Sequence, residues 1–454
     1  MRETIGTTTQ RDRWILLVWF IFFFLSPYSV SSAFQHVTVV PTSVILTLSF
    51  LFALVIYMKF RPEARVFQAF DRSNQELWLL VAFVVPLLTA SLAGAYNLTV
   101  ILSAEYQQYF FQSLPRRVIN LSLILLVFWI SVKLIRLFTT HQLLFLTRAY
   151  VLSVIVIAWV GLWQLGHFLF GFPMVNLSTR SFVHSVTSEV MFNFRLTSIV
   201  DEPSYLVPLL IDGLIIGFVV YRDKWRYLGE LALPCMVVLL FSYSLSGYVN
   251  VAMLVGVLII LFLFQGKGGR PKRYLIFMYG GILTLLLIVF AREFIMDLLM
   301  PVIGRFETVF DLHRHSRLYM LVMPIIWLFD YSWINSLFGF GPGSYQFLAD
   351  TKFLHHQGRL SVTSNNVFID LLYEHGIFGF AAFLLVYLKI LVTLYKKRFD
   401  DRYYMYALLL WFHLGITSLY RSDFASPRFW VIILICFIFI ELAKRNRHVL
   451  KNLE

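Results

Sequence analysis

The sequence predicts an all-α integral membrane protein, one transmembrane unit over 1–454 with about twelve spans. Hydrophobic residues make up 59% of the 454 and charged residues 14%, and the mean hydropathy is +0.75. Long uncharged runs recur along the whole chain, which is typical of a protein that faces lipid. The net charge of +13 lies in short basic clusters between these runs, where membrane anchoring and topology explain it, so we expect no nucleic-acid partner.

The runs are 16 to 22 residues long, or 24 to 33 Å at 1.5 Å per residue, which is close to the roughly 30 Å thickness of the hydrocarbon core. The expected spans are 14–34, 40–58, 77–98, 118–137, 149–170, 205–221, 229–245, 249–265, 274–291, 376–395, 403–420 and 428–443. Arg11, Arg13 and the run up to Ser31–Ala33 resemble a cleaved signal peptide, but we expect this run to be retained as the first span. Cys235 and Cys436 lie inside runs and form neither a disulfide framework nor a metal-ligand pattern.

The basic residues also predict the orientation. If the N-terminus lies inside, the inner segments carry 26 of the 38 Lys and Arg residues, and the outer segments carry the other 12. This agrees with the positive-inside rule, so we expect both termini in the cytoplasm. The run 318–340 is also apolar enough to cross, which would invert every later segment. Pro324, Asp330 and Asn335 within it favour a broken helix at the membrane interface instead.

The loops are short except for three outer segments, 99–117, 172–204 and the large segment 292–375, where we expect interfacial helices and function. In the second segment, Arg195 precedes Asp201, Glu202 and Tyr205. Pro203 is expected early in the next helix, which holds both carboxylates at the positive end of that helix. Ordinary capping explains the same pattern. Ser246 and Tyr248 reach the outer face at a tight turn between two helices.

The large segment holds arginines suited to a diphosphate, because a guanidinium bonds two phosphate oxygens at once. It also holds glycines that let backbone N–H groups approach an anion, and two histidines that could act as a base. These residues are Arg305, Arg314 and Arg317, then Gly339, Gly341 and Gly343, then His355 and His356. The alternative is that the arginines pair with nearby acids or lipid headgroups, and that the histidines are merely solvated.

A helix capped near Ser364 follows the large segment. It would place Asn366, Asp370 and Glu374 one turn apart on a polar face directed toward the outer mouth, next to Asn365. Amides and carboxylates there could bind sugar hydroxyls. A face packed against other helices is the alternative.

Together these pieces resemble the bacterial O-antigen polymerase and O-antigen ligase superfamily of glycan-assembling membrane enzymes. The resemblance covers 195–379: Arg195 with Glu202 to Tyr205, the Ser-x-Ser-Gly turn at 244–247, Arg317 before an apolar run, the glycines at 339–343, and the Asn-rich helix start with Glu-x-Gly-x-x-Gly at 374–379. The first 170 residues match only in being spans.

The resemblance implies a GT-C-like glycosyltransferase in the bacterial inner membrane, with its site facing the periplasm. It implies no metal or other cofactor, a lipid-linked donor and acceptor on undecaprenyl diphosphate, and possible contact with a chain-length-regulating membrane protein. Arg195 and Arg317, helped by Arg314 and Arg305, would bind the diphosphate. Glu202 would be the base, with His355 or His356 as second choice.

One departure separates polymerase from ligase. The ligase pattern His-Asn aligns with Asn365 and Asn366, and an amide is no general base at ordinary pH. This favours a polymerase that moves the growing glycan en bloc to the next lipid-linked repeat unit, with inversion. An O-antigen ligase or a protein O-oligosaccharyltransferase is the nearer rival. A secondary transporter is the more distant one, because Asp212 and Glu230 are expected near span ends or in short, polar-flanked helices.

Overall fold

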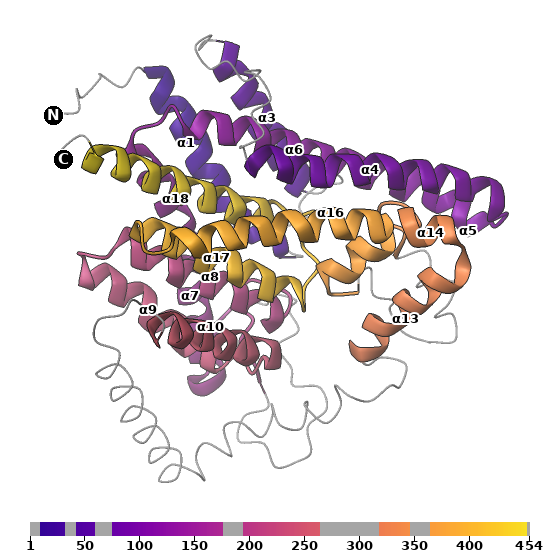
Figure 1. Cartoon of the computed structure of the whole chain (residues 1–454). Coiled ribbons are helices and arrows are strands. Elements are labelled where there is room, and N and C mark those ends of the chain that lie inside the picture. Colours follow the sequence, from indigo (N-terminus) through magenta and orange to yellow (C-terminus); the bar gives the residue numbers. More distant parts are fainter. Residues whose placement is uncertain are drawn as a thin grey trace.

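The protein is a helical membrane protein, described here from a computed structural model that covers residues 10–31, 42–59, 75–175, 194–263, 317–345 and 364–451. Figure 1 shows most of the longer helices lying roughly along one direction. The helices are α1 (Gln10–Leu25), η1 (Ser26–Val30), α3 (Thr42–Lys59), α4 (Gln75–Val100), α5 (Ala104–Gln108), η2 (Tyr109–Ser113), α6 (Leu114–Ile135), α7 (Thr140–Phe170), α8 (Pro203–Val220), α9 (Trp225–Leu240), α10 (Leu245–Leu263), α13 (Arg317–Tyr331), α14 (Trp333–Phe338), α16 (Val367–Lys397), α17 (Arg402–Ser418) and α18 (Pro427–Lys451).

Seven stretches within the described ranges are long and apolar enough to cross a membrane. They are Asp12–Val30, Thr42–Lys59, Leu77–Val100, Tyr106–Ile135, Thr140–Phe170, Pro203–Val220 and Val367–Lys397. Every expected span overlaps a described helix except 274–291, which lies outside the described residues. The expected broken helix at 318–340 is present, because α13 ends at Tyr331 and Ser332 caps α14 by accepting from the Asn335 N–H at 3.2 Å.

The helix boundaries depend more on local capping residues than on where the apolar runs begin. α7 begins at Thr140, earlier than the expected 149, because Thr139 and Gln142 form a capping box: each side chain accepts a hydrogen bond from the other residue's backbone N–H. α8 begins at Pro203, in the first-turn position expected for a residue without an N–H. α16 begins at Val367, because Asn366 rather than Ser364 caps it.

The bundle has two ends, which differ in chemistry. We call the end where α1 begins and α18 finishes the proximal end, and the other the distal end (Figure 1). At the proximal end, Arg445 of α18 donates to the backbone carbonyls of Ile135, Arg136 and Phe138, which fixes α18 against the end of α6. Asp400 pairs with Arg447 there at 3.4 Å. At the distal end, the helices meet through short connections and through α13 and α14.

Residues 339–343, which we call the glycine loop, pack against α16 at the distal end. Gly339 and Gly376 both have positive φ, with ψ near 180°, a region that is essentially restricted to glycine. At these two positions the backbones of the loop and the α16 kink lie so close that a Cβ on Gly376 would be 2.3 Å from the Leu337 carbonyl carbon. The N–H groups of Phe340 and Gly341 donate to the carbonyls of Tyr373 and Glu374, both at 3.1 Å. The loop therefore locks the kink at Gly376.

We expect Gly376→Ala to lower the free energy of unfolding by about 3 kcal/mol, because the new side chain meets backbone and the φ angle becomes strained. Gly256→Ala is the matched control, because Gly256 lies within α10 and a Cβ atom there would have no neighbour within 4 Å. Its replacement should leave the free energy of unfolding unchanged or raise it. Thermal unfolding in one detergent measures both. Equal midpoints would contradict the locking role of the loop.

Candidate functional site

The connection between α17 and α18 lies at the distal end, because α18 starts there and finishes at the proximal end. Its residues contact four helices: α6, α8, α16 and α18. The Asn120 side chain of α6 donates to the Ala425 carbonyl at 3.0 Å, and Ser422 donates to the Asp370 carboxylate of α16. We call residues 421–425 the central turn. A short connection between two apolar helices thus gathers polar groups from across the bundle.

Arg421 is the most unusual residue of the central turn. It is 5% exposed, and its guanidinium lies 3.3 Å from the centroid of the Tyr205 ring, at the start of α8. Within the described ranges, no hydrogen bond or ion pair reaches this side chain, and its Nε is buried without a partner. Burial lowers the pKa of Arg421 from its ordinary value, yet an arginine remains charged. The turn therefore holds a buried cation whose donors are available to an anion.

A second arginine approaches the same turn from α6. The Arg117 guanidinium lies 4.7 Å from the Phe424 ring centroid, and its Nη2 is 3.7 Å from Glu374 Oε1. The Arg117 Nε and the Glu374 Oε2 are both buried and lack hydrogen-bond partners in the described part of the chain. This pair is therefore only partly satisfied, in contrast to the network described next.

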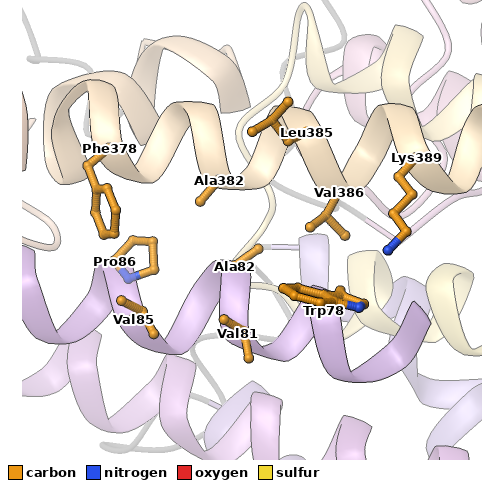
Figure 2. A pocket seen from close by; sticks show the side chains of 10 residues that line it. All are labelled: Trp78, Val81, Ala82, Val85, Pro86, Phe378, Ala382, Leu385, Val386 and Lys389. Carbon is orange, nitrogen blue, oxygen red and sulfur yellow. The ribbon is translucent and has the colours of Figure 1, made fainter. Parts of the chain in front are cut away.

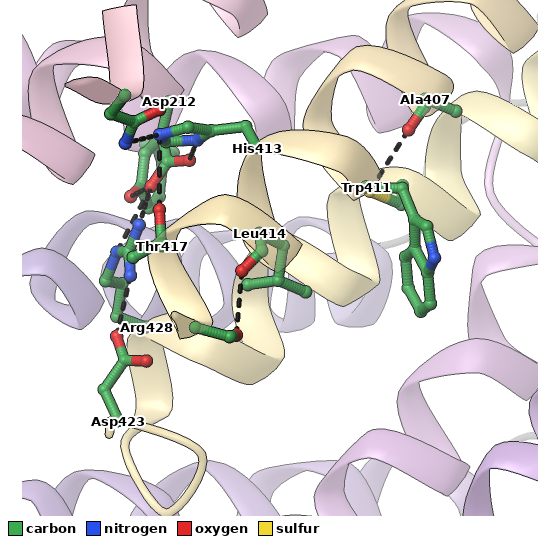
Figure 3. A network of polar contacts seen from close by, with 12 residues as sticks. Asp212, Ala407, Trp411, His413, Leu414, Thr417, Asp423 and Arg428 are labelled. Carbon is green, nitrogen blue, oxygen red and sulfur yellow. Dashed lines mark hydrogen bonds and ion pairs between the residues drawn. The ribbon is translucent and has the colours of Figure 1, made fainter. Parts of the chain in front are cut away.

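A network of hydrogen bonds and ion pairs around Arg428 and Asp212 holds the turn in place (Figure 3). Arg428 of α18 donates to Asp212 of α8 through Nε at 3.2 Å and through Nη2, and to Asp423 through Nη1 at 2.7 Å. His413 of α17 donates from Nδ1 to Asp212 at 2.8 Å, and its Nε2 accepts from the Asn250 amide at 3.0 Å. These hydrogen bonds join α8, α10, α17 and α18. The other oxygen of Asp423, Oδ1, is buried without a partner among the described residues.

Asp212 therefore lies where the sequence interpretation did not expect it. It is the tenth of the eighteen residues of α8 and is 0% exposed, so it is not near a span end. A third donor, the Tyr150 hydroxyl, reaches it at 3.1 Å. A buried carboxylate requires this degree of pairing, because an unpaired charge in an apolar interior is costly.

The carboxylates and amides expected to bind sugar are mostly engaged by the protein. Asn366 caps α16 through its side-chain oxygen, and its amide donates to the Leu419 carbonyl at 2.9 Å. Asp370 accepts from the Ser364 N–H at 2.9 Å and from Ser422. Asn365, beside them, has a φ of +58°. In this structure these residues hold the start of α16 against the central turn.

The segment that carries Arg195 is anchored to α7. Gln164 accepts from the N–H groups of Thr197 and Ser198 at 2.9 and 2.8 Å, and Leu196 donates to the Phe241 carbonyl at 2.9 Å. The chain then runs through Asp201 to Glu202, the N-cap of α8, whose carboxylate accepts from Ser204 at 3.2 Å. Arg195 and Glu202 thus lie on one anchored segment that leads directly to Tyr205.

The turn between α9 and α10 is held by its own side chains. The Ser244 and Ser246 hydroxyls lie 3.1 Å apart, and the Tyr248 hydroxyl donates to the Leu240 carbonyl. The sequence also predicted that backbone N–H groups of the glycine loop approach an anion. The N–H groups of Gly339, Phe340 and Gly341 instead donate to backbone carbonyls. A Cβ atom on Gly343 would lie 3.4 Å from the Arg117 side chain.

Several predicted residues fall outside what the structure describes. His355, His356, Arg305 and Arg314 lie outside the described residues, and for Arg317 only the backbone is described, as the first residue of α13. Conversely, the sequence interpretation did not single out Arg117, Arg421, Asp423 or Arg428 as site residues. The available signal was the charge density of Arg421, Asp423 and Arg428 between two apolar runs.

Comparisons with known proteins give no assignment. No protein-family model matches the sequence, and no curated protein matches it either. Within the described residues, no group of three or more His, Cys, Asp or Glu side chains could hold a metal ion.

We expect Arg428→Met to lower the free energy of unfolding by about 3–5 kcal/mol, because it leaves Asp212 and Asp423 buried without their cation. Arg447→Met removes an arginine of the same helix whose partner is Asp400, and both of those side chains are largely exposed. Its expected cost is below about 1 kcal/mol. Denaturant unfolding in micelles compares the two, and a similar loss for both would show that the buried network contributes little to stability.

Proposed function

We propose that this membrane protein is a glycosyltransferase that polymerises lipid-linked oligosaccharide repeat units. In this proposal it is a GT-C-like protein of the bacterial inner membrane with twelve spans, both termini in the cytoplasm and the distal end facing the periplasm. It transfers the growing glycan from undecaprenyl diphosphate to a hydroxyl of the next undecaprenyl-diphosphate-linked repeat unit.

The single observation that carries the proposal is Arg421. A guanidinium that is buried yet has neither a hydrogen bond nor an ion pair within the described part of the chain is costly by itself. An anionic ligand would offset that cost, and a diphosphate matches a planar fork of donors better than a single point charge does. Tyr205, which the sequence already singled out, lies against this guanidinium.

The chemistry follows from where charge develops. The bond from the anomeric carbon to the diphosphate oxygen breaks, a bond to the acceptor oxygen forms, and the acceptor proton passes to a base. Negative charge grows on the departing diphosphate, so a fixed cation lowers the transition-state energy more than the ground-state energy. Arg421 and Arg117 join Arg195 and Arg317 as candidate cations in this step.

The base needs a carboxylate oxygen that can still accept a proton. Glu202 remains the first candidate, at the start of α8 and three residues before Tyr205. Asp423 and Glu374 are added by the structure, because each has one buried oxygen without a hydrogen-bond partner in the ranges described. Asp423 is two residues from Arg421, which suits a base adjacent to a leaving-group site.

A secondary transporter is the second candidate, and the network around Asp212 favours it. Buried ionisable residues inside a membrane protein often mark an ion pathway. If this protein couples transport to protons, reconstituted liposomes should show proton flux that Asp212→Asn abolishes. The glycosyltransferase proposal expects no such flux from the wild-type protein, and a flux that depends on Asp212 would overturn it.

For the main proposal, purified protein incubated with a synthetic undecaprenyl-diphosphate repeat unit should produce a ladder of glycans of increasing length. Arg421→Ala should lower the rate by about 10²–10³, as expected for loss of one preorganised donor to a developing charge. Arg421→Lys should restore little, because a point charge does not replace the fork. Glu202→Ala and Arg317→Ala should abolish the ladder.

The matched control is Arg447→Ala, which removes an exposed arginine at the proximal end and should leave the ladder intact. A ladder from Arg421→Ala as long as that of the wild type would rule out this arginine as the diphosphate-binding group. Transfer to lipid A core or to a protein acceptor, without a ladder, would indicate the ligase or O-oligosaccharyltransferase instead.

A further inference from the structure

An apolar groove runs between α4 and α16 (Figure 2), and none of its lining residues belongs to the central turn. Phe83 and Phe383 hold the two helices together through an edge-to-face contact with ring centroids 5.4 Å apart. Two small residues, Ala82 and Ala382, line the space between the helices and leave it unfilled. The result is a hollow of about 340 Å³, within the range of pockets that bind small molecules.

The groove opens on the surface that faces lipid. Its lining is apolar except for Lys389, and Leu385 on its rim is 69% exposed. Both helices contain stretches that are long and apolar enough to cross a membrane. In a bilayer, hydrocarbon chains therefore surround the opening, and a chain that enters the groove meets only apolar side chains for most of its length.

Lys389 supplies the charge that selects an occupant. It lies at one end of the groove, on the exposed side of α16, and its ammonium is 4.8 Å from the centroid of the Trp78 ring. Within the described residues no carboxylate pairs with it, and the groove lining contains no acidic residue. An ammonium on a lipid-facing helix surface is stable only where it reaches an anion or water.

The position of Lys389 also fits a lipid headgroup. It lies eight residues before the end of α16 at Lys397, which is about 12 Å along a helix. Trp78 lies near the start of α4, and the two residues form the combination of tryptophan and lysine typical of a membrane interface. We propose that this groove binds one anionic phospholipid, with its phosphate on Lys389 and one acyl chain between Ala82 and Ala382.

A lipid bound in the groove would act on α16, the helix that carries Glu374. At the other end of the groove, His375 bonds through Nδ1 to the Pro86 carbonyl at 3.2 Å, and Glu374 is the preceding residue. A lipid that fills the hollow stabilises the α4–α16 pair and therefore the placement of Glu374. This inference concerns lipid binding and holds whether or not the protein transfers sugars.

The test uses the full chain in vesicles of phosphatidylcholine that contain a trace of lipid with a photoreactive acyl chain. Phosphatidylglycerol probe should label peptides from 75–100 and 376–397 about fivefold more than phosphatidylcholine probe, as expected for one lysine beside a net-negative headgroup, because choline neutralises the phosphate of phosphatidylcholine. Lys389→Gln should abolish this preference. Lys396→Gln, which removes an exposed lysine of the same helix outside the groove, should retain it.

Ala382→Phe should reduce labelling by both probes, because it fills the hollow; Ala82→Leu serves the same purpose if that variant does not fold. Each variant's thermal midpoint in pure phosphatidylcholine should match that of the wild type. Equal labelling by the two probes, or equal effects of Lys389→Gln and Lys396→Gln, would overturn the proposal. So would displacement of the probe by one equivalent of a polyprenyl diphosphate, or crosslinking of these peptides to a second copy of the chain.

Discussion

Burial of arginine at the distal end is the constraint on which the rest of this structure depends. An unpaired guanidinium in an apolar interior costs several kcal/mol, so each such residue dictates what surrounds it. Arg428 is compensated by Asp212 and Asp423, and Arg117 is partly compensated by Glu374. Arg421 lies against the Tyr205 ring and has no hydrogen bond or ion pair within the described chain. The three arginines therefore range from a paired, structural one, Arg428, to one whose donors are available to a ligand, Arg421. Arg428 fixes the turn from which Arg421 projects.

A second device places the acidic partner of Arg117. The glycine loop at 339–343 approaches α16 backbone to backbone, which is possible only where no Cβ intervenes. Its hydrogen bonds to Tyr373 and Glu374 hold the kink at Gly376 in one conformation. The loop thus holds the backbone of Glu374, whose carboxylate lies 3.7 Å from Arg117 Nη2. Helix α14 and the glycine loop that follows it thus act on the site through backbone contacts.

The sequence could predict what depends on neighbouring residues. Hydropathy located the helices, and local chemistry predicted the Pro203 position and a break within 318–340. The break lies at Ser332, while Pro324 stays inside α13. The partnership of Asp212 and Arg428 could not be predicted, because the two residues are far apart in sequence and nothing local links them. Arg421 could not be singled out either, since a short charged connection between apolar runs has the same composition whether it faces lipid headgroups or a buried site. About half of the large segment 292–375, including Arg305, Arg314, His355 and His356, lies outside the described residues.

The two candidate functions can also be compared by asking which buried charged groups already have hydrogen-bond partners. A residue that carries protons across a membrane has to change its charge during each cycle. Asp212 accepts from Arg428, His413 and Tyr150, and each of these hydrogen bonds favours its ionised form, so protonation there would break a network that joins four helices. Arg421 has the opposite character, because a bound anion would add interactions without removing any that the described residues provide. A fixed cation beside an acidic residue with a free oxygen is what transfer from an anionic leaving group requires, and this asymmetry favours the glycosyltransferase over the transporter.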